Sequence, residues 1–217
     1  MLLCLPTIVL RVLCQVPCYA DYDGSSLGSL RCVDADGDGM VTLDEILNTT
    51  LLSNRPDKNK SIFGGNTLIM RFNELELFTN VVGWFYFDGC SNLIEFSLPP
   101  ITSIGLSTLN CSSLKRVVIP EGCVKLDAGI SMGSDSIELV QFPSTLQSIY
   151  NSSIFHANRS SFVLVCKAVT PPSVDNFGYM HIKPTIYVPD GSVDAYKSAD
   201  KWSALAAYIH PLSEYAG

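Results

Sequence analysis

A ten-residue motif recurs in the middle of the chain at almost constant spacing. The segment Cys90–Pro99 returns as Cys111–Pro120, 21 residues later, and a looser copy at Ser134–Pro143 follows after another 23 residues. A fourth apolar segment occupies residues 161–165. Repeats of this length form solenoids, because one turn cannot bury its own apolar row and neighbouring turns bury it by stacking. The sequence therefore predicts a scaffold of stacked coils.

Each copy of the motif alternates apolar and polar residues as a short strand does. The apolar positions of the three copies are Leu93, Phe96 and Leu98, then Leu114, Val117 and Ile119, then Ile137, Val140 and Phe142. The proline that closes each copy ends the strand, because it has no N–H to donate. A second apolar pair follows each proline: Ile101/Ile104, Val124/Leu126 and Leu146/Ile149. We expect a mainly β solenoid whose 21–23-residue coils contain two short extended segments and no long helix.

The repeated motif, the segment 142–149 and the closing segment Val188–Trp202 resemble the BspA-like leucine-rich-repeat family of bacterial cell-surface proteins. The resemblance covers roughly residues 72–213. The third copy departs from the pattern, since Ser134 replaces the cysteine of the first two copies and residues 129–133 replace the usual aromatic-containing turn. The resemblance implies a leucine-rich-repeat solenoid that contacts a host or bacterial protein or glycan.

Composition excludes some classes of partner. The net charge of −7 and the pI near 4.8 argue against nucleic-acid binding, which requires a basic surface. The apolar content of 47% over 217 residues is enough for a continuous core in one or two domains. We expect no transmembrane helix, because no apolar run reaches the roughly 18 residues that a bilayer demands.

The first twenty residues resemble an export signal that is cleaved after Ala20, although basic residues are missing before the apolar run. The alternatives are an apolar cap helix and upstream sequence read through from a misplaced start. Together with the resemblance to surface proteins, this segment leads us to expect a secreted or cell-surface protein.

The segment from Asp34 to Glu45 matches the EF-hand calcium loop at every specified position. The ligands that this spacing predicts are the side chains of Asp34, Asp36, Asp38, Thr42 and Glu45 and the backbone carbonyl of Met40. Gly39 allows the sharp turn, and residues 42–52 form a candidate helix after the loop. We expect one structural Ca²⁺ ion here, the alternative being an acidic turn that matches by chance.

One calcium loop does not make a paired sensor, which needs two hands. Residues 21–25 begin like a second loop but lack its later glycine and glutamate, so we expect a turn there. A dockerin-like module would normally carry two duplicated loop–helix segments. This reading, in which the calcium module anchors the chain in a larger surface assembly, is therefore the alternative to an adhesion-type binding module.

The polar segment 54–60 contains a proline and marks a domain boundary. We expect an EF-hand-like module at 21–60, the solenoid with an N-terminal cap at 61–178, and a helical C-terminal cap at 179–217. A short helix over 72–78, capped by Asn73, would cover the open end of the first coil. In the C-terminal cap, we expect a strand at 185–188, a helix that Ser192 caps, and a last helix that Pro211 ends.

Four consecutive aromatic residues, Trp84–Phe87, form the strongest aromatic cluster of the chain. On a strand, two of these side chains point inward and two outward. Trp84 and Tyr86 are the candidate ligand-binding pair, because exposed aromatic rings can stack on sugars or contact proteins. The alternative is that the cluster fills the core of the first coil.

The eight cysteines do not predict a dense disulfide framework. Cys90 and Cys111 share one repeat position and should stack as buried free thiols, whereas the pairing of Cys32, Cys123 and Cys166 is left open.

The three histidines, His156, His181 and His210, fall at no metal-ligand spacing, and the chain contains no nucleophile or phosphate-binding motif. We therefore expect a binding protein and no enzyme.

Overall fold

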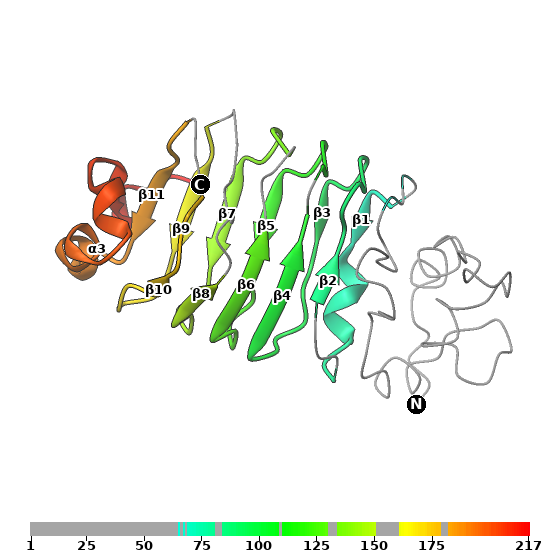
Figure 1. The fold of residues 1–217 in the computed structure, drawn as a ribbon, viewed down its shortest axis with the longest axis horizontal. Helices are drawn as coiled ribbons and strands as arrows, with labels where there is room; N and C mark the ends of the chain where they lie inside the picture. The colour runs from blue at the N-terminus through cyan, green and yellow to red at the C-terminus, as the bar shows by residue number, and fades with distance from the viewer. Residues whose placement is uncertain are drawn as a thin grey trace, which may run out of the picture.

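The computed structural model describes residues 65, 67, 69–80, 84–108, 110–129, 134–150, 161–178 and 182–217. The predicted signal segment and the calcium module both lie outside the described residues. Within them the chain winds as stacked coils along the long axis of the molecule, with helices at the C-terminal end (Figure 1).

The described coils place their strands on two sides, and between β11 and β12 helices take the place of a strand on the second side. On the first side lie β1 (Arg71–Phe72), β3 (Glu95–Phe96), β5 (Arg116–Val118), β7 (Leu139–Phe142), β9 (Val163–Cys166), β11 (Thr185–Val188) and β12 (Ile209–Pro211). On the second lie β2 (Trp84–Tyr86), β4 (Ser103–Ser107), β6 (Lys125–Gly129), β8 (Ser148–Tyr150) and β10 (Ser173–Val174). The sheet orders are β12-β11-β9-β7-β5, here called the odd sheet, and β10-β8-β6-β4-β2, the even sheet; β1 and β3 form a separate pair.

All strand pairings in the described part are parallel, as stacking of successive coils requires. The predicted two-strand coil is confirmed, since the apolar residues after each proline lead into β4, β6 and β8.

Backbone hydrogen bonds fix the register between coils. The N–H of Lys115 donates to the carbonyl of Ile94 (3.0 Å), and the N–H of Glu138 donates to the carbonyl of Lys115 (2.8 Å). These bonds align the preceding apolar residues of three successive coils. The aligned residues are Leu93, Leu114 and Ile137, each no more than 4% exposed. The stacking that the 21- and 23-residue offsets predict is therefore confirmed.

The core lies between the two sides and is built from matching positions of each coil. The odd-sheet column consists of Val117, Val140, Leu164, Ile186 and Ile209. The even-sheet column consists of Ile104, Leu126, Ile149 and Val174. Fully burying one such side chain stabilises the fold by about 1.5–3 kcal/mol, and each column continues through every neighbouring coil.

The helix expected at 72–78 is a shorter 3₁₀ helix, η1 (Asn73–Leu77), and the predicted cap at Asn73 is wrong. Phe72 occupies the N-cap position, and no side chain caps the helix. Asn73 is already the first helical residue, so its side chain is not in a capping position. Because η1 connects β1 to β2, it forms the bend of a coil, where Leu75 is fully buried.

The C-terminal segments differ in detail from the expected ones. The strand at 185–188 is confirmed as β11, and η2 (Asp190–Ser192) leads into α3 (Val193–Ser198). Ser192 makes no side-chain cap bond, which corrects that prediction. The last expected helix is the 3₁₀ helix η3 (Trp202–Tyr208), and a short 3₁₀ turn, η4 (Leu212–Glu214), follows β12. Pro211 was predicted to end a helix. It instead ends β12, a strand that pairs with β11.

Two side-chain hydrogen bonds hold these helices on the last coils. Tyr196 donates its hydroxyl to the carbonyl of Ala168 (2.7 Å), and the indole N–H of Trp202 donates to the carbonyl of Pro172 (2.9 Å). Both rings are fully buried, and they pack edge to face with centroids 4.8 Å apart. The cap thus satisfies backbone carbonyls that burial would otherwise leave unpaired.

We predict that Leu114→Ala lowers the free energy of unfolding by about 2–5 kcal/mol, because it opens a cavity in a column shared by two neighbouring coils. Urea denaturation monitored by circular dichroism measures the change. The control is Lys115→Ala, which removes an exposed side chain paired with Glu138 and should cost less than about 1 kcal/mol. Equal losses in the two variants would contradict the stacked core.

Candidate functional site

The outward positions of the even sheet form one continuous surface, here called the even face. Alternation decides its members, since Phe85, Leu106 and Leu126 are buried and their neighbours along each strand point the other way. The register aligns Trp84 with Gly105, then Gly105 with Asp127, and Asp127 with Tyr150. A second outward row pairs Tyr86 with Ser107 and Ser107 with Gly129. A third contains Ser103, Lys125, Ser148 and Ser173.

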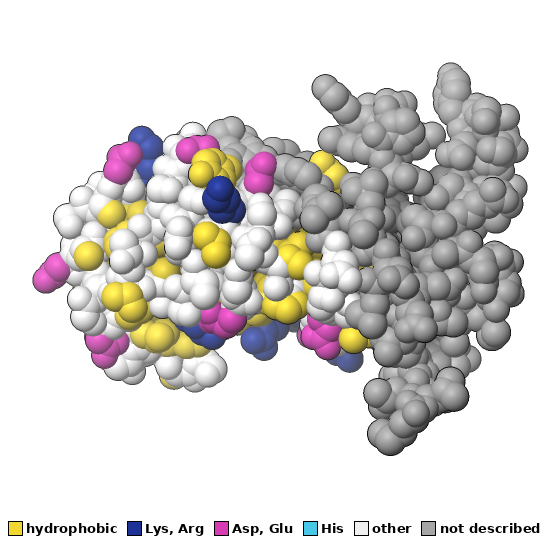
Figure 2. Space-filling view, turned by 90° about the horizontal axis from the view of Figure 1, so that it is seen from below, with side chains coloured by type: hydrophobic (Ala, Val, Ile, Leu, Met, Phe, Trp, Pro, Cys, Tyr) yellow, Lys and Arg dark blue, Asp and Glu magenta, His cyan; other side chains and the backbone are white. Residues whose placement is uncertain are grey.

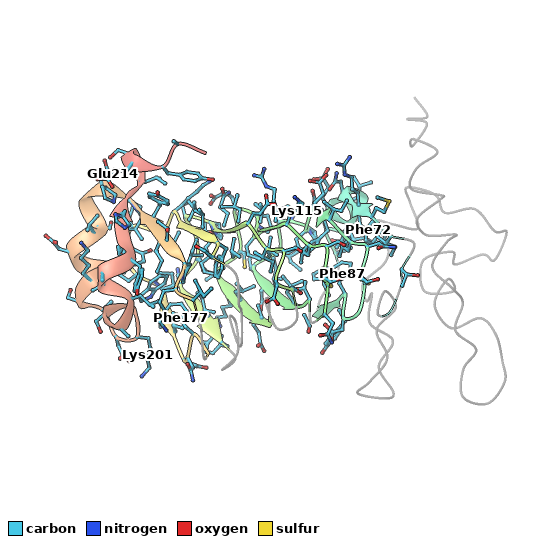
Figure 3. All side chains as sticks on the ribbon, turned by 90° about the horizontal axis from the view of Figure 1, so that it is seen from above. Phe72, Phe87, Lys115, Phe177, Lys201 and Glu214 are labelled. Atoms are coloured by element: carbon cyan, nitrogen blue, oxygen red, sulfur yellow. The ribbon has the colours of Figure 1, made fainter. Side chains whose placement is uncertain are left out.

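The aromatic cluster divides between the core and the surface. Phe85 and Phe87 are buried, and Phe87 stacks on Phe96 with ring centroids 4.8 Å apart. Figure 3 places Phe72 and Phe87 in the same end of the solenoid, where their rings meet edge to face at 6.4 Å. The core-filling alternative is therefore correct for the two phenylalanines.

Of the two candidate ligand-binding aromatic residues, the structure describes the side chain of Tyr86 and only the backbone of Trp84. Tyr86 is half-buried on the even face beside Ser107. Trp84 has its backbone in β2 opposite Gly105, and its side chain lies outside the described part. A role for either residue in binding stays a prediction.

A further aromatic residue, Tyr150, lies on the even face and was not predicted. It is 43% exposed, and its neighbours across the sheet are Asp127 on β6 and Asp175 after β10. The N–H of Asp175 donates to the carbonyl of Ile149 (3.3 Å), which continues the register to this position. The sequence signal for Tyr150 was strand alternation: because Ile149 belongs to the predicted apolar pair, the residue after it should point outward.

The edge of the even face is pinned between two coils. Ser107 donates its hydroxyl to the carboxylate of Asp88 at 2.6 Å. This bond connects the turn after β2 to the end of β4, so the backbone around Tyr86 is held by a hydrogen bond between two coils.

Acidic, basic and hydrophobic side chains are interspersed on the surface seen in Figure 2.

The predicted calcium ligands Asp34, Asp36, Asp38, Met40, Thr42 and Glu45 lie outside the described residues. In the part of the chain that the structure describes, no three His, Cys, Asp or Glu side chains are grouped as a metal site would need. Of the histidines, only His210 is described; its ring lies 3.6 Å from the carboxylate of Glu214 in the exposed cap.

Comparison with known families decides the classification of the chain. A family model described as BspA type leucine rich repeat region, in six copies, matches residues 60–170. The chain belongs to this BspA-type leucine-rich-repeat family. No curated protein matches it.

Members of the BspA-type family are generally non-enzymatic interaction modules, typically secreted or on bacterial surfaces. Over the described ranges, no helix has the length and apolarity needed to cross a membrane.

The cysteine position of the BspA-type repeat is a structural column. Cys90, Cys111 and Ser134 are all buried and occupy it in successive coils. Cys111 donates its thiol hydrogen to the carbonyl of Phe87 (2.9 Å), and Ser134 donates its hydroxyl to the equivalent carbonyl of Thr108 (2.8 Å). The serine of the third copy thus makes the same contact as the cysteine that it replaces.

Burial suppresses the ionisation of three of the described thiols. Burial raises the pKa of Cys111 to about 12, and the neighbouring Cys90 adds to this shift. Burial also raises the pKa of Cys123 and of Cys166 to about 11. All four described cysteines are free and buried, as predicted for the repeat pair. Because the thiolate is the reactive form, these groups are packing residues and not nucleophiles.

We predict that iodoacetamide at pH 8 labels Cys111, Cys123 and Cys166 at least roughly a hundredfold more slowly in the folded protein than in urea, because folding suppresses their thiolates. Mass spectrometry of the labelled peptides measures each site separately. Rapid labelling of Cys111 in the folded protein would contradict its assignment to the core.

The same burial sets a dependence of stability on pH. Folding raises the thiol pKa values above their ordinary value of 9.0, so the unfolded chain loses these protons first. Their contribution to stability is therefore complete below pH 9 and is lost as the pH rises toward 11–12.

Proposed function

We propose that the chain is a secreted or cell-surface recognition module of the adhesion type, which binds an extracellular protein or glycan through the even face. The observation that carries this proposal is the presence of Tyr86 and the exposed Tyr150 on one outward surface. Aromatic side chains bring a large contact area and a polar tip to a ligand. The stacked coils beneath them form a stiff support, because every strand of the sheet is paired with a neighbour.

The test is binding of the full chain to an immobilised desialylated glycoprotein and to a panel of extracellular-matrix proteins, measured by surface plasmon resonance. The double variant Tyr86→Ala/Tyr150→Ala should weaken binding at least tenfold, since two contact side chains are removed. Tyr208→Ala is the matched control, because Tyr208 is similarly exposed (41%) but belongs to the cap helix η3. Binding that survives the double variant would refute the role of the even face.

We also propose that the segment Asp34–Glu45 holds one structural Ca²⁺ ion. The support is the match of the sequence to the calcium loop at each ligand position. Four carboxylates gathered within one loop repel one another without a cation, so the ion would order this segment.

We predict that millimolar calcium raises the melting temperature of the full chain by about 3 °C relative to chelator, as expected for a site of about 10⁻⁴ M affinity. Differential scanning calorimetry measures the shift. Glu45→Gln should abolish the shift, whereas the control Glu76→Gln, which alters an exposed residue of η1, should retain it. An unchanged melting temperature in calcium would contradict the presence of this site.

The second candidate is a dockerin-like role, in which the calcium module docks the chain in a larger surface assembly. The complete calcium loop favours it, and the presence of one convincing copy ranks it second. The variant Glu45→Gln separates the two roles. Loss of partner binding in this variant alone, with the even-face variants unaffected, would favour docking through the calcium module.

A further inference from the structure

The two outward faces of the solenoid differ in chemistry. Among the described outward positions, the odd sheet carries four aliphatic side chains in adjacent strands: Val118 and Val163 are half-buried, and Leu139 and Val165 are buried. The even face carries no aliphatic side chain at its described outward positions, which hold serine, glycine, tyrosine, aspartate and lysine. At its described positions the even face therefore offers separate aromatic residues among polar groups and no aliphatic cluster.

Tyr150 and the acidic residues beside it combine an aromatic ring with carboxylates, the groups that a small polar ring would contact. The register aligns Asp127 and Asp175 with Tyr150 on the strands to either side, one strand spacing of about 4.8 Å away. Tyr150 and Asp175 are both exposed, whereas Asp127 is half-buried and its Oδ1 is shielded from solvent. The aromatic face of Tyr150 can stack on the C–H side of a sugar ring, while the exposed carboxylate of Asp175 accepts hydrogen bonds from its hydroxyl groups.

The position of Tyr86 extends this surface across the sheet. Tyr86 lies three strands from Tyr150 and one outward row further along, which places their Cα atoms about 16 Å apart for ordinary strand spacings. That distance exceeds the size of one sugar ring. The hydroxyl of Ser107 and the flat surface over Gly105 lie between the two aromatic residues.

The charges on this surface select against anionic ligands. Asp88, Asp127 and Asp175 lie on or beside the even face, and Lys125 is the one cation among its described outward positions. The resulting negative excess repels sulfated or sialylated chains and nucleic acid. The same negative excess attracts a basic peptide, which the binding experiment therefore includes as a separate group.

We propose that the even face binds a neutral oligosaccharide chain, with Tyr150 as the stacking platform, Asp175 as the hydroxyl acceptor, and Tyr86 as a second platform. This inference rests on the proposed function and names the ligand class of the same surface.

The experiment is binding of the fluorescently labelled full chain to a printed array that carries neutral glycans, sialylated and sulfated glycans, and a basic peptide as separate groups. We expect signal on neutral glycans with three or more sugar units, because shorter ones cannot reach both platforms. Tyr150→Ala and Asp175→Asn should each weaken binding to the best neutral glycan about tenfold by titration calorimetry. The controls Tyr208→Ala and Asp194→Asn change exposed residues of the cap and should bind as the unaltered protein does.

Absence of signal on every neutral glycan overturns the inference, as does signal confined to the anionic glycans or to the basic peptide. Equal weakening by Tyr150→Ala and Tyr208→Ala overturns it as well. If the chain still binds a matrix protein through the even face in any of these cases, the ligand class is wrong and the recognition role stands.

Discussion

The structure depends on one constraint: a coil of about two dozen residues has too little chain to enclose an apolar interior. Each coil therefore shares its interior with the coils on either side, and the parallel hydrogen bonds between Ile94, Lys115 and Glu138 hold the shared positions in line. Register is as important as hydrophobicity here, because a slip of one residue would turn the buried column of Val117 and Val140 toward solvent.

A stack of coils must also end, and the C-terminal segments solve that problem with polar as well as apolar contacts. Tyr196 and Trp202 bury large rings against the last coils, and each donates one hydrogen bond to a carbonyl of the loop between β9 and β10. The pKa of Tyr196 is raised by burial, so its hydroxyl keeps the proton that this bond requires. The cap thus covers the end of the core, and its last residues also reach the outward side of β11, where Tyr215 packs on Tyr187.

Features that repeat from coil to coil could be predicted from the sequence, whereas features that occur once could not. The alignment of Leu93, Leu114 and Ile137 followed from spacing alone, because the same environment is imposed on each coil. The 3₁₀ geometry of Asn73–Leu77 could not be read from so few residues, over which the periods of the two helix types are nearly the same. The strand at Ile209–Pro211 depends on a partner far away in sequence, β11, which local propensity does not report. Tyr150 was not predicted because the apolar pair after the proline, Leu146 and Ile149, reports the buried side chains of the strand. It does not report the outward residue that follows them.

The direction of the hydrogen bonds between coils has a mechanical consequence. Figure 1 shows the coils stacked along the long axis, so the bonds that join them lie along that axis as well. A tether that pulls the two ends apart loads these bonds in line with the force. Because each coil contacts chiefly its neighbours, the stack yields by peeling off one coil at a time, and the protein lengthens in small steps instead of rupturing at once.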